Sequence, residues 1–136
     1  MRRRVAIMLG LTFAVGIAFG VIGNQFLNAQ QPPIKRTEVL KTEMAGMEGK
    51  EAHMWVAEIA PGAATGKHAH PTPRFVYVMA GSVTLEIEGK SPQTFKTGEG
   101  FQEMPDVVHN FSNASTTEPA KALGFQIAGK GQPLQY

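Results

Sequence analysis

Apolar and polar residues alternate along much of the chain after residue 34. Between Ser82 and Glu88, the apolar residues Val83, Leu85 and Ile87 occupy every second position. This period is typical of a strand with one buried face. Weaker versions of the pattern predict further strands at 52–60, 74–80, 100–104, 107–112 and 120–127, and we find no convincing amphipathic helix in this part of the chain.

Glycine and proline separate the predicted strands, at 61–62, 80–81, 88–89, 97–98, 104–105 and 129–133. Short strands at nearly regular spacing are typical of antiparallel sandwiches and barrels. The chain has 136 residues, which is enough for one domain with a modest core. We therefore expect an all-β, single-domain antiparallel β-barrel or jelly roll.

The first 29 residues have a different character. Three arginines at positions 2–4 precede an uncharged apolar run at 5–23, and Ala29 ends a possible cleavage site. This order is typical of a secretory signal peptide, although the run is nearly long enough for a membrane anchor helix. We expect residues 1–29 to be a signal peptide or anchor, 30–35 a linker, 36–130 the barrel and 131–136 a C-terminal tail. The protein would then be exported, either periplasmic or anchored in the inner membrane and facing the periplasm.

Charge and cysteine content exclude several function classes. The chain has 13 basic and 11 acidic residues, and without the three leading arginines the balance is 10 to 11. No basic patch for nucleic acid is visible, so we expect none as a partner. The sequence contains no cysteine, which excludes disulfides and thiolate chemistry.

Histidines suggest a metal site. His68 and His70 are two residues apart, so in an extended segment both imidazoles point to the same side. A third histidine, His109, lies between Val107 and Phe111 in a later predicted strand. Imidazole binds several transition metals, and three histidines leave open positions for water or substrate.

The same alternation divides the strand at 74–80 into two faces. Continuing from the histidines, it places Arg74, Val76 and Val78 on the metal side, and it places Phe75, Tyr77 and Met79 on the opposite side. Outward aromatic residues and exposed edge strands favour a homodimer. Met79 and Met104 are interpreted mainly as core residues, although Met104 could line a pocket mouth. His53 is interpreted as a surface residue.

Two spaced motifs resemble those of the cupin superfamily. The first resembles the pattern Gly, His, His, Glu, Gly, and is formed here by Gly62, His68, His70, Arg74 and Gly81. The second is formed by Gly98, Pro105, His109 and Asn113, with Asp106 where that motif has glycine. The resemblance extends over roughly residues 36–130. It implies a small β-barrel that binds a divalent metal through His68, His70 and His109.

Arg74 departs from the family pattern, which has a glutamate ligand at this position. An arginine has no lone pair for a metal, and at ~5 Å its charge would repel a divalent ion by about 6 to 7 kcal/mol at an effective dielectric of ~20. Three alternatives follow. Arg74 could turn aside and pair with Glu103 or Glu86, it could bind the carboxylate of an anionic substrate, or the metal could be lost.

Three histidines without glutamate are still compatible with a metal, because thiol dioxygenases are cupins of that kind. The cofactor we expect is a divalent ion of iron, copper, nickel, zinc or manganese, with manganese least favoured when the carboxylate is missing. The substrate-binding candidates are Arg74, Glu103 and Met104, and Glu103 could instead act as a ligand or general base. No catalytic residue is assigned.

The function we predict is an exported metal-binding cupin with a three-histidine site that binds or acts on a small, anionic molecule. An enzymatic version would be a metal-dependent oxidoreductase of the dioxygenase kind. The alternative is a non-catalytic or metal-free cupin of the cell envelope, with a ligand-binding or structural role. In each case we expect a small-molecule ligand, a homodimer, no nucleic acid, and membrane contact only through the N-terminal segment.

Overall fold

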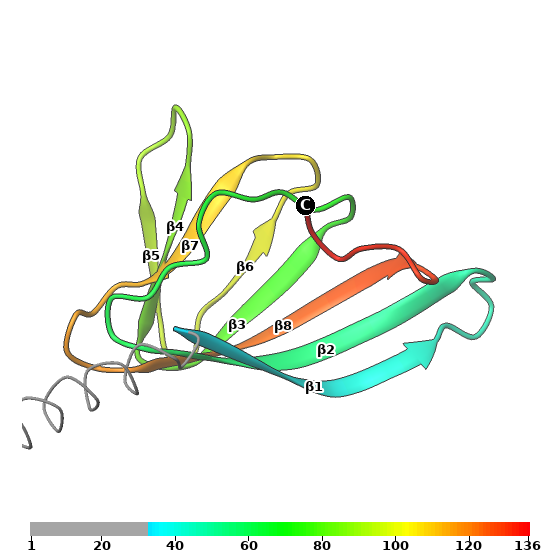
Figure 1. The fold of residues 1–136 in the computed structure, drawn as a ribbon, viewed down its shortest axis with the longest axis horizontal. Helices are drawn as coiled ribbons and strands as arrows, with labels where there is room; N and C mark the ends of the chain where they lie inside the picture. Colours follow the sequence, from blue (N-terminus) through cyan, green and yellow to red (C-terminus); the bar gives the residue numbers. More distant parts are fainter. Residues whose placement is uncertain (1–32) are drawn as a thin grey trace, which may run out of the picture. The chain divides into compact units, whose positions relative to one another are not determined.

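A computed structural model describes residues 33–136, which form eight strands (Figure 1). The predicted signal or anchor at 1–29 lies outside the described residues. The strands are β1 (Ile34–Glu43), β2 (Lys50–Ile59), β3 (Arg74–Ala80), β4 (Ser82–Ile87), β5 (Gln93–Lys96), β6 (Gly100–Glu103), β7 (His109–Asn113) and β8 (Ala120–Gly129).

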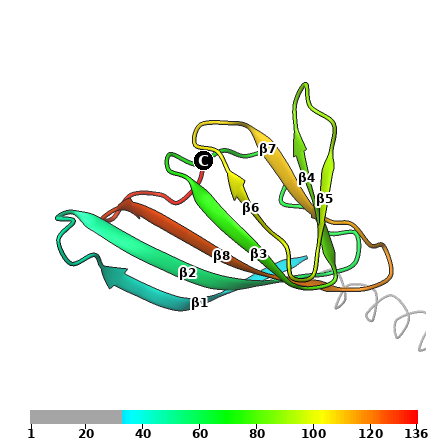
Figure 2. The same cartoon turned by 180° about the vertical axis from the view of Figure 1, so that it is seen from behind.

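The strands pair into two antiparallel sheets. The larger has the order β1-β2-β8-β3-β6, and the smaller has the order β5-β4-β7 (Figures 1 and 2). Residues 33–136 contain no helix, so the all-β expectation is confirmed for the described part of the chain. Nothing in residues 33–136 forms a helix with the length and apolarity needed to cross a bilayer.

Strand β3 has the two faces that its alternation predicts. Arg74, Val76 and Val78 are buried, whereas Phe75, Tyr77 and Met79 are 42–48% exposed. The interpretation of Met79 as a core residue is therefore wrong, because its position in the alternation turns it outward. Met104 is also exposed, at 51%.

The core lies between the inner faces of the two sheets. Val78 from the larger sheet and Val83 from the smaller are both fully buried, and Phe111 on β7 belongs to the same cluster. Phe95 and Phe101 stack at 4.2 Å between ring centroids and close one side of the cluster. This packing holds β3, β6 and β7 in the arrangement on which the histidine site depends.

Two turns of the predicted motifs need unusual backbone angles. Gly81 has φ +73°, and a Cβ there would lie 2.8 Å from the carbonyl oxygen of Pro119. Asp106, which replaces a motif glycine, has φ 58°. Aspartate tolerates this region better than most residues, so the substitution preserves the turn.

The predicted elements differ from the structure in two unpredicted strands, in the bounds of the linker and in the tail. Strands β1 and β5 were not predicted individually, since their side chains are mostly exposed and show no clean alternation. Strand β1 begins at Ile34, so the predicted linker at 30–35 extends two residues too far. The tail at 131–136 returns to the loops before β3 and after β6, where it forms hydrogen bonds (Figure 1).

Candidate metal centre

Three elements bring the site together. His68 and His70 lie in the segment before β3, Glu103 ends β6, and His109 begins β7. His68 and His109 form an isolated antiparallel bridge, in which each backbone N–H donates to the other carbonyl at 3.0 Å. The bridge places two predicted ligands opposite each other, although 41 positions separate their numbers in the sequence.

The three histidines share one hydrogen-bonding arrangement. Each Nδ1 contacts the carbonyl oxygen of a residue two positions away: Gly66 for His68 at 3.0 Å, Thr72 for His70 at 2.8 Å, and Val107 for His109 at 2.8 Å. A carbonyl only accepts hydrogen bonds, so each Nδ1 must carry a proton. In the neutral ring, Nε2 then carries the lone pair that a metal requires.

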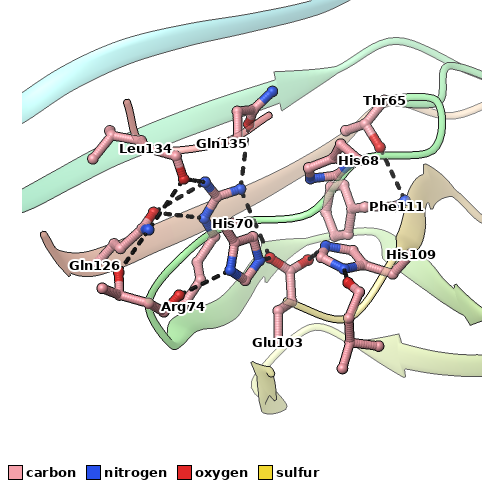
Figure 3. A network of polar contacts seen from close by, with 12 residues as sticks. Thr65, His68, His70, Arg74, Glu103, His109, Phe111, Gln126, Leu134 and Gln135 are labelled. Atoms are coloured by element: carbon pink, nitrogen blue, oxygen red, sulfur yellow. Dashed lines mark hydrogen bonds and ion pairs between the residues drawn. The ribbon is translucent and has the colours of Figure 1, made fainter. Parts of the chain in front are cut away.

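Glu103 lies between two of these rings (Figure 3). Its Oε2 is 3.2 Å from Nε2 of His70, and its Oε1 is 3.5 Å from Nε2 of His109. One ligand atom from each of these three residues lies within 4.8 Å of the others. Two lone pairs cannot face a carboxylate favourably, so a proton on each Nε2 or a cation among the groups is required.

His68 lies beside this compact group. Its ring centroid is 4.4 Å from that of His109 and 6.2 Å from that of His70. The Nε2 atoms of His68 and His109 are buried without a hydrogen-bond partner among residues 33–136. The structure thus brings the three predicted ligands together and adds Glu103, while the tightest set of donors is His70, Glu103 and His109.

Arg74 is buried beside the histidine group, with its guanidinium between Gln126 and Glu103 (Figure 3). Its Nε and Nη2 donate to Oε1 of Gln126 at 3.1 and 3.0 Å, and its Nη1 is 3.8 Å from Oε2 of Glu103. Its guanidinium carbon is 5.0 Å from the ring centroid of Trp55. Contact with Glu103 corresponds to the first of the three alternatives for this residue.

The buried charges shift one another's pKa values. Burial opposes ionisation of Glu103, but its interactions with His109 and His70 and the charge of Arg74 outweigh burial and lower its pKa to about 2. Burial disfavours the charged form of His109, yet the contacts with Glu103 and the Val107 carbonyl raise its pKa. Burial lowers the pKa of His68, against the hydrogen bond to Gly66, and the charge of His109 lowers it further.

Comparison with known sequence families decides the family. The model of the family described as Cupin domain matches residues 55–125, just over half of the chain. The matched segment contains all four site residues, from His68 to His109. The protein is a cupin.

A curated relative matches this cupin over part of its length. Protein SchB from Streptomyces halstedii is 36% identical over 66 residues, which cover 48% of this chain and 47% of that protein. The match therefore spans about half the length of that curated relative.

Among solved structures, DMSP lyase DddQ from Ruegeria pomeroyi has a TM-score of 0.61 at 16% identity, covering 76% of this chain and 51% of that one. A cupin domain from Bordetella pertussis has a TM-score of 0.56 at 24% identity, covering 74% of this chain and 98% of that one. At these identities the likeness shows the fold alone.

In this cupin a carboxylate lies one strand away from the position at which the resembled motif has its acid. Arg74 on β3 is directly opposite Glu103 on β6 in the strand register. Position 74 thus has an arginine where the motif has glutamate, and the carboxylate of Glu103 lies one strand away. No local sequence pattern connects Glu103 to the histidines, because only the strand register brings them together.

The other predicted residues lie farther out. Met104 lines neither of the cavities described below, and Glu86 accepts a hydrogen bond from Asn110 rather than pairing with Arg74. His53, interpreted as a surface residue, is 8% exposed and lies on the inner side of β2, 3.5 Å from Glu51. That interpretation is wrong, because the register places His53 opposite the fully buried Gln126.

A small cavity adjoins the histidine group. It has a volume of about 30 Å³ and is lined by His68, Glu103, Arg74 and Thr65, among others. This volume admits a water molecule or two but no organic ligand. Any larger molecule that approaches the site must therefore occupy space outside this cavity.

The donor set is suited to a transition metal. Buried imidazoles whose Nδ1 protons are fixed by carbonyls, next to a carboxylate, form the kind of site that borderline metals such as iron, nickel and zinc occupy. Nitrogens of His68 and His109 without partners are costly in a buried site unless something binds them. On this ground the residues present fit a divalent ion.

Proposed function

We propose that this cupin binds one divalent transition-metal ion through His70, Glu103 and His109, with His68 as a further ligand. The observation that carries the proposal is the convergence of Nε2 atoms on one buried carboxylate while every Nδ1 is held by a carbonyl. Without a metal, Nε2 of His68 is buried with no partner among the described residues, and Nε2 of His109 has only the 3.5 Å contact with Glu103. For that reason we favour metal binding over the metal-free alternative.

We further propose that the site serves a small anionic molecule. Arg74 gives the site a buried guanidinium next to the metal ligands. Burial lowers the pKa of Arg74 to about 10, against the charge of Glu103, and the nearby charge of Arg36 lowers it further. Two neighbouring guanidinium groups that repel each other favour an anion between or beside them.

A bound ion would supply Lewis-acid or redox chemistry. The chain itself supplies orientation and proton control. Before an ion binds, a proton on Nε2 of His109 faces Oε1 of Glu103 at 3.5 Å, and ligation through Nε2 would release that proton. Arg74 lies 3.8 Å from the same carboxylate. We propose ligand binding at such a centre as the core function, with an oxidoreductase of the dioxygenase kind as its catalytic form.

Elemental analysis of the full chain, purified without a histidine tag, tests metal binding. We expect close to one equivalent of a first-row metal in the wild type, and loss of it in His70→Ala and His109→Ala. His53→Ala is the matched control, since it removes a buried histidine outside the donor group. A wild type without metal that also fails to bind added Zn²⁺ or Fe²⁺ would refute the proposal.

We also propose that the protein is exported through residues 1–29. The support is the order of arginines, apolar run and small residue in the sequence. Mass spectrometry of the protein from fractionated cells tests it. A periplasmic species that begins near residue 30 supports a signal peptide, an intact chain in the membrane fraction supports an anchor, and an intact cytoplasmic chain contradicts export.

A further inference from the structure

The guanidinium of Arg74 presents two different edges. One edge, formed by Nε and Nη2, is held by Oε1 of Gln126, which is itself fully buried. Gln126 in turn donates from Nε2 to Oγ1 of Thr72 at 2.9 Å. Since Gln126 is opposite Arg74 in the β3–β8 register, this edge is fixed by the sheet.

The other edge faces the C-terminal tail, and its Nη1 is also 3.8 Å from Oε2 of Glu103. Nη2 donates to the carbonyl oxygen of Leu134 at 3.1 Å, and Nη1 donates to Oε1 of Gln135 at 3.4 Å (Figure 3). Two oxygens, one on each terminal nitrogen, are what a carboxylate offers to an arginine in a bidentate pair. Charged acceptors bind a guanidinium roughly twice as strongly as neutral ones, so a carboxylate would compete well with the tail.

A larger cavity opens beside these tail atoms. Its volume is about 310 Å³, and Arg36, Trp55, Arg74, Leu134 and Gln135 are among the residues that line it. Trp55 contributes apolar lining, Glu38 is the carboxylate that lines the cavity, and His53 also borders it. Arg36, Trp55 and Arg74 also line the 30 Å³ cavity next to the histidines. The wall between the two spaces is thus formed in part by Arg74.

Hydrogen bonds hold the tail in place, and the carbonyl oxygen of Leu134 also accepts one from Nε2 of Gln126 at 3.1 Å. Tyr136 exchanges two backbone hydrogen bonds of 2.9 Å with Ala69, and its hydroxyl donates to Oδ1 of Asp106 at 2.7 Å. Gln135 and Tyr136 are exposed, so little apolar surface secures them. Ala69 lies between His68 and His70, which connects the tail directly to the segment that carries two metal ligands.

We propose that Leu134 and Gln135 of the tail occupy the position on Arg74 at which the carboxylate of a ligand binds. A small carboxylic acid with an apolar body binds in the 310 Å³ cavity, places its two oxygens on Nη1 and Nη2 of Arg74, and displaces Leu134 and Gln135. Its apolar body lies against Trp55, and Arg36 supplies a second positive charge at the cavity wall. The inference rests on the proposed function, because it names the ligand class for the same centre.

Binding of phenylacetate to the metal-free full chain tests the inference, with uncharged phenylacetamide as the matched probe. Trp55 is the only tryptophan in the sequence, so its fluorescence reports on the cavity. We expect a saturable change with phenylacetate and none with phenylacetamide at the same concentrations. We also expect the amide NMR signals of Gln135 and Tyr136 to shift towards those of free chain.

Variants separate the tail from the guanidinium. Tyr136→Phe removes the bond to Asp106 and should tighten phenylacetate binding ~3- to 10-fold, whereas Tyr77→Phe, far from the tail on the outer face, should not. Arg74→Gln should abolish phenylacetate binding, provided that circular dichroism shows that this variant is folded. If Arg74→Gln is unfolded, the binding affinity of Tyr136→Phe tests the inference instead.

Equal binding of the two probes, no binding of phenylacetate, or unmoved tail signals would overturn the inference. Zn²⁺ titration of the same samples distinguishes failure of this inference from failure of the proposed metal binding. Retained Zn²⁺ binding without phenylacetate binding overturns the tail proposal alone, while absence of Zn²⁺ binding overturns the metal proposal.

Discussion

At the scale of single residues, the three histidines of the site share one hydrogen-bonding arrangement. His68, His70 and His109 each fix the Nδ1 proton on a nearby carbonyl, which leaves Nε2 for a proton or a metal. The spacing of His68 and His70 and the place of His109 in the second motif were visible in the sequence. The tautomers were not, because they depend on carbonyls whose directions only the folded backbone sets.

Replacement of Glu103 tests the carboxylate of the donor group. In Glu103→Gln the amide keeps the shape but loses the negative charge that offsets a divalent ion, so we expect metal affinity to fall at least about tenfold. Isothermal titration with Zn²⁺ measures it. Glu88→Gln, which removes an exposed carboxylate paired with Lys67, is the control. Equal affinity in the two variants would mean that Glu103 is no ligand.

Acid and base should affect the metal-free protein differently. The pKa of Glu103 is lowered to about 2, so its contribution to stability is present above its usual value of ~4.3 and is lost as pH falls towards 2. The pKa of His109 is raised, so its contribution is present below ~6.5 and is lost as pH rises through the raised value. Both contributions are therefore present between about pH 4.5 and 6.5.

Urea unfolding across this range measures the effect. We expect the free energy of unfolding of the metal-free wild type to decline on both sides of the window, and the decline to flatten in Glu103→Gln. An identical pH profile in wild type and variant would show that the buried contacts of Glu103 do not contribute to stability.

At the scale of elements, the strand register brings together site residues that lie far apart in the sequence. Across the inner face of the larger sheet, register aligns His53, Gln126, Arg74 and Glu103 from β2, β8, β3 and β6. Alternation within β3 predicted that Arg74 turns inward, but no local pattern predicts its neighbours on other strands. Strand β1 was missed for a related reason, since an edge strand with mostly exposed side chains has no apolar period.

Gly124 on β8 makes room for Trp55 on β2. A Cβ at Gly124 would lie 2.3 Å from Cε2 of Trp55, and the indole ring of Trp55 packs against the guanidinium of Arg74. We expect Gly124→Ala to lower the free energy of unfolding by about 1 to 3 kcal/mol and to shift Trp55 fluorescence, although alanine ordinarily suits a strand better than glycine. Chemical denaturation followed by fluorescence measures both.

Gly129→Ala is the matched control on the same strand. A Cβ there meets the end of the Gln132 side chain, which can move away, so we expect a much smaller change. If the two variants lose equal stability, the close approach of Trp55 to Gly124 does not govern the packing of this face.

At the scale of the whole molecule, β3 presents exposed apolar residues on the outer face of the larger sheet. Phe75, Tyr77 and Met79 are each more than 40% exposed, and Phe75 lies 6.4 Å from Phe125 between ring centroids. The homodimer expected from the sequence stays a prediction, and this face is where we place a second copy. Exposed aromatic residues on one sheet face suit a two-fold interface, in which the same surface is used twice.

Light scattering after size exclusion measures the oligomeric state. We expect the wild type to elute as a dimer and Phe75→Glu as a monomer, because the substitution places two like charges near the two-fold axis. Val108→Glu, an equally exposed position off this face, should remain dimeric. A monomeric wild type, or a dimeric Phe75→Glu, would contradict this placement.

The central claim is that tautomer-fixed imidazoles and Glu103 hold a single ion. A crystal structure of the purified protein, with diffraction data on both sides of the absorption edge of its metal, tests this most directly. We predict one anomalous peak within bonding distance of Nε2 of His70, Nε2 of His109 and a carboxylate oxygen of Glu103. A peak bound elsewhere, for example at Glu51 and His53, or no peak in metal-saturated crystals, would contradict the account.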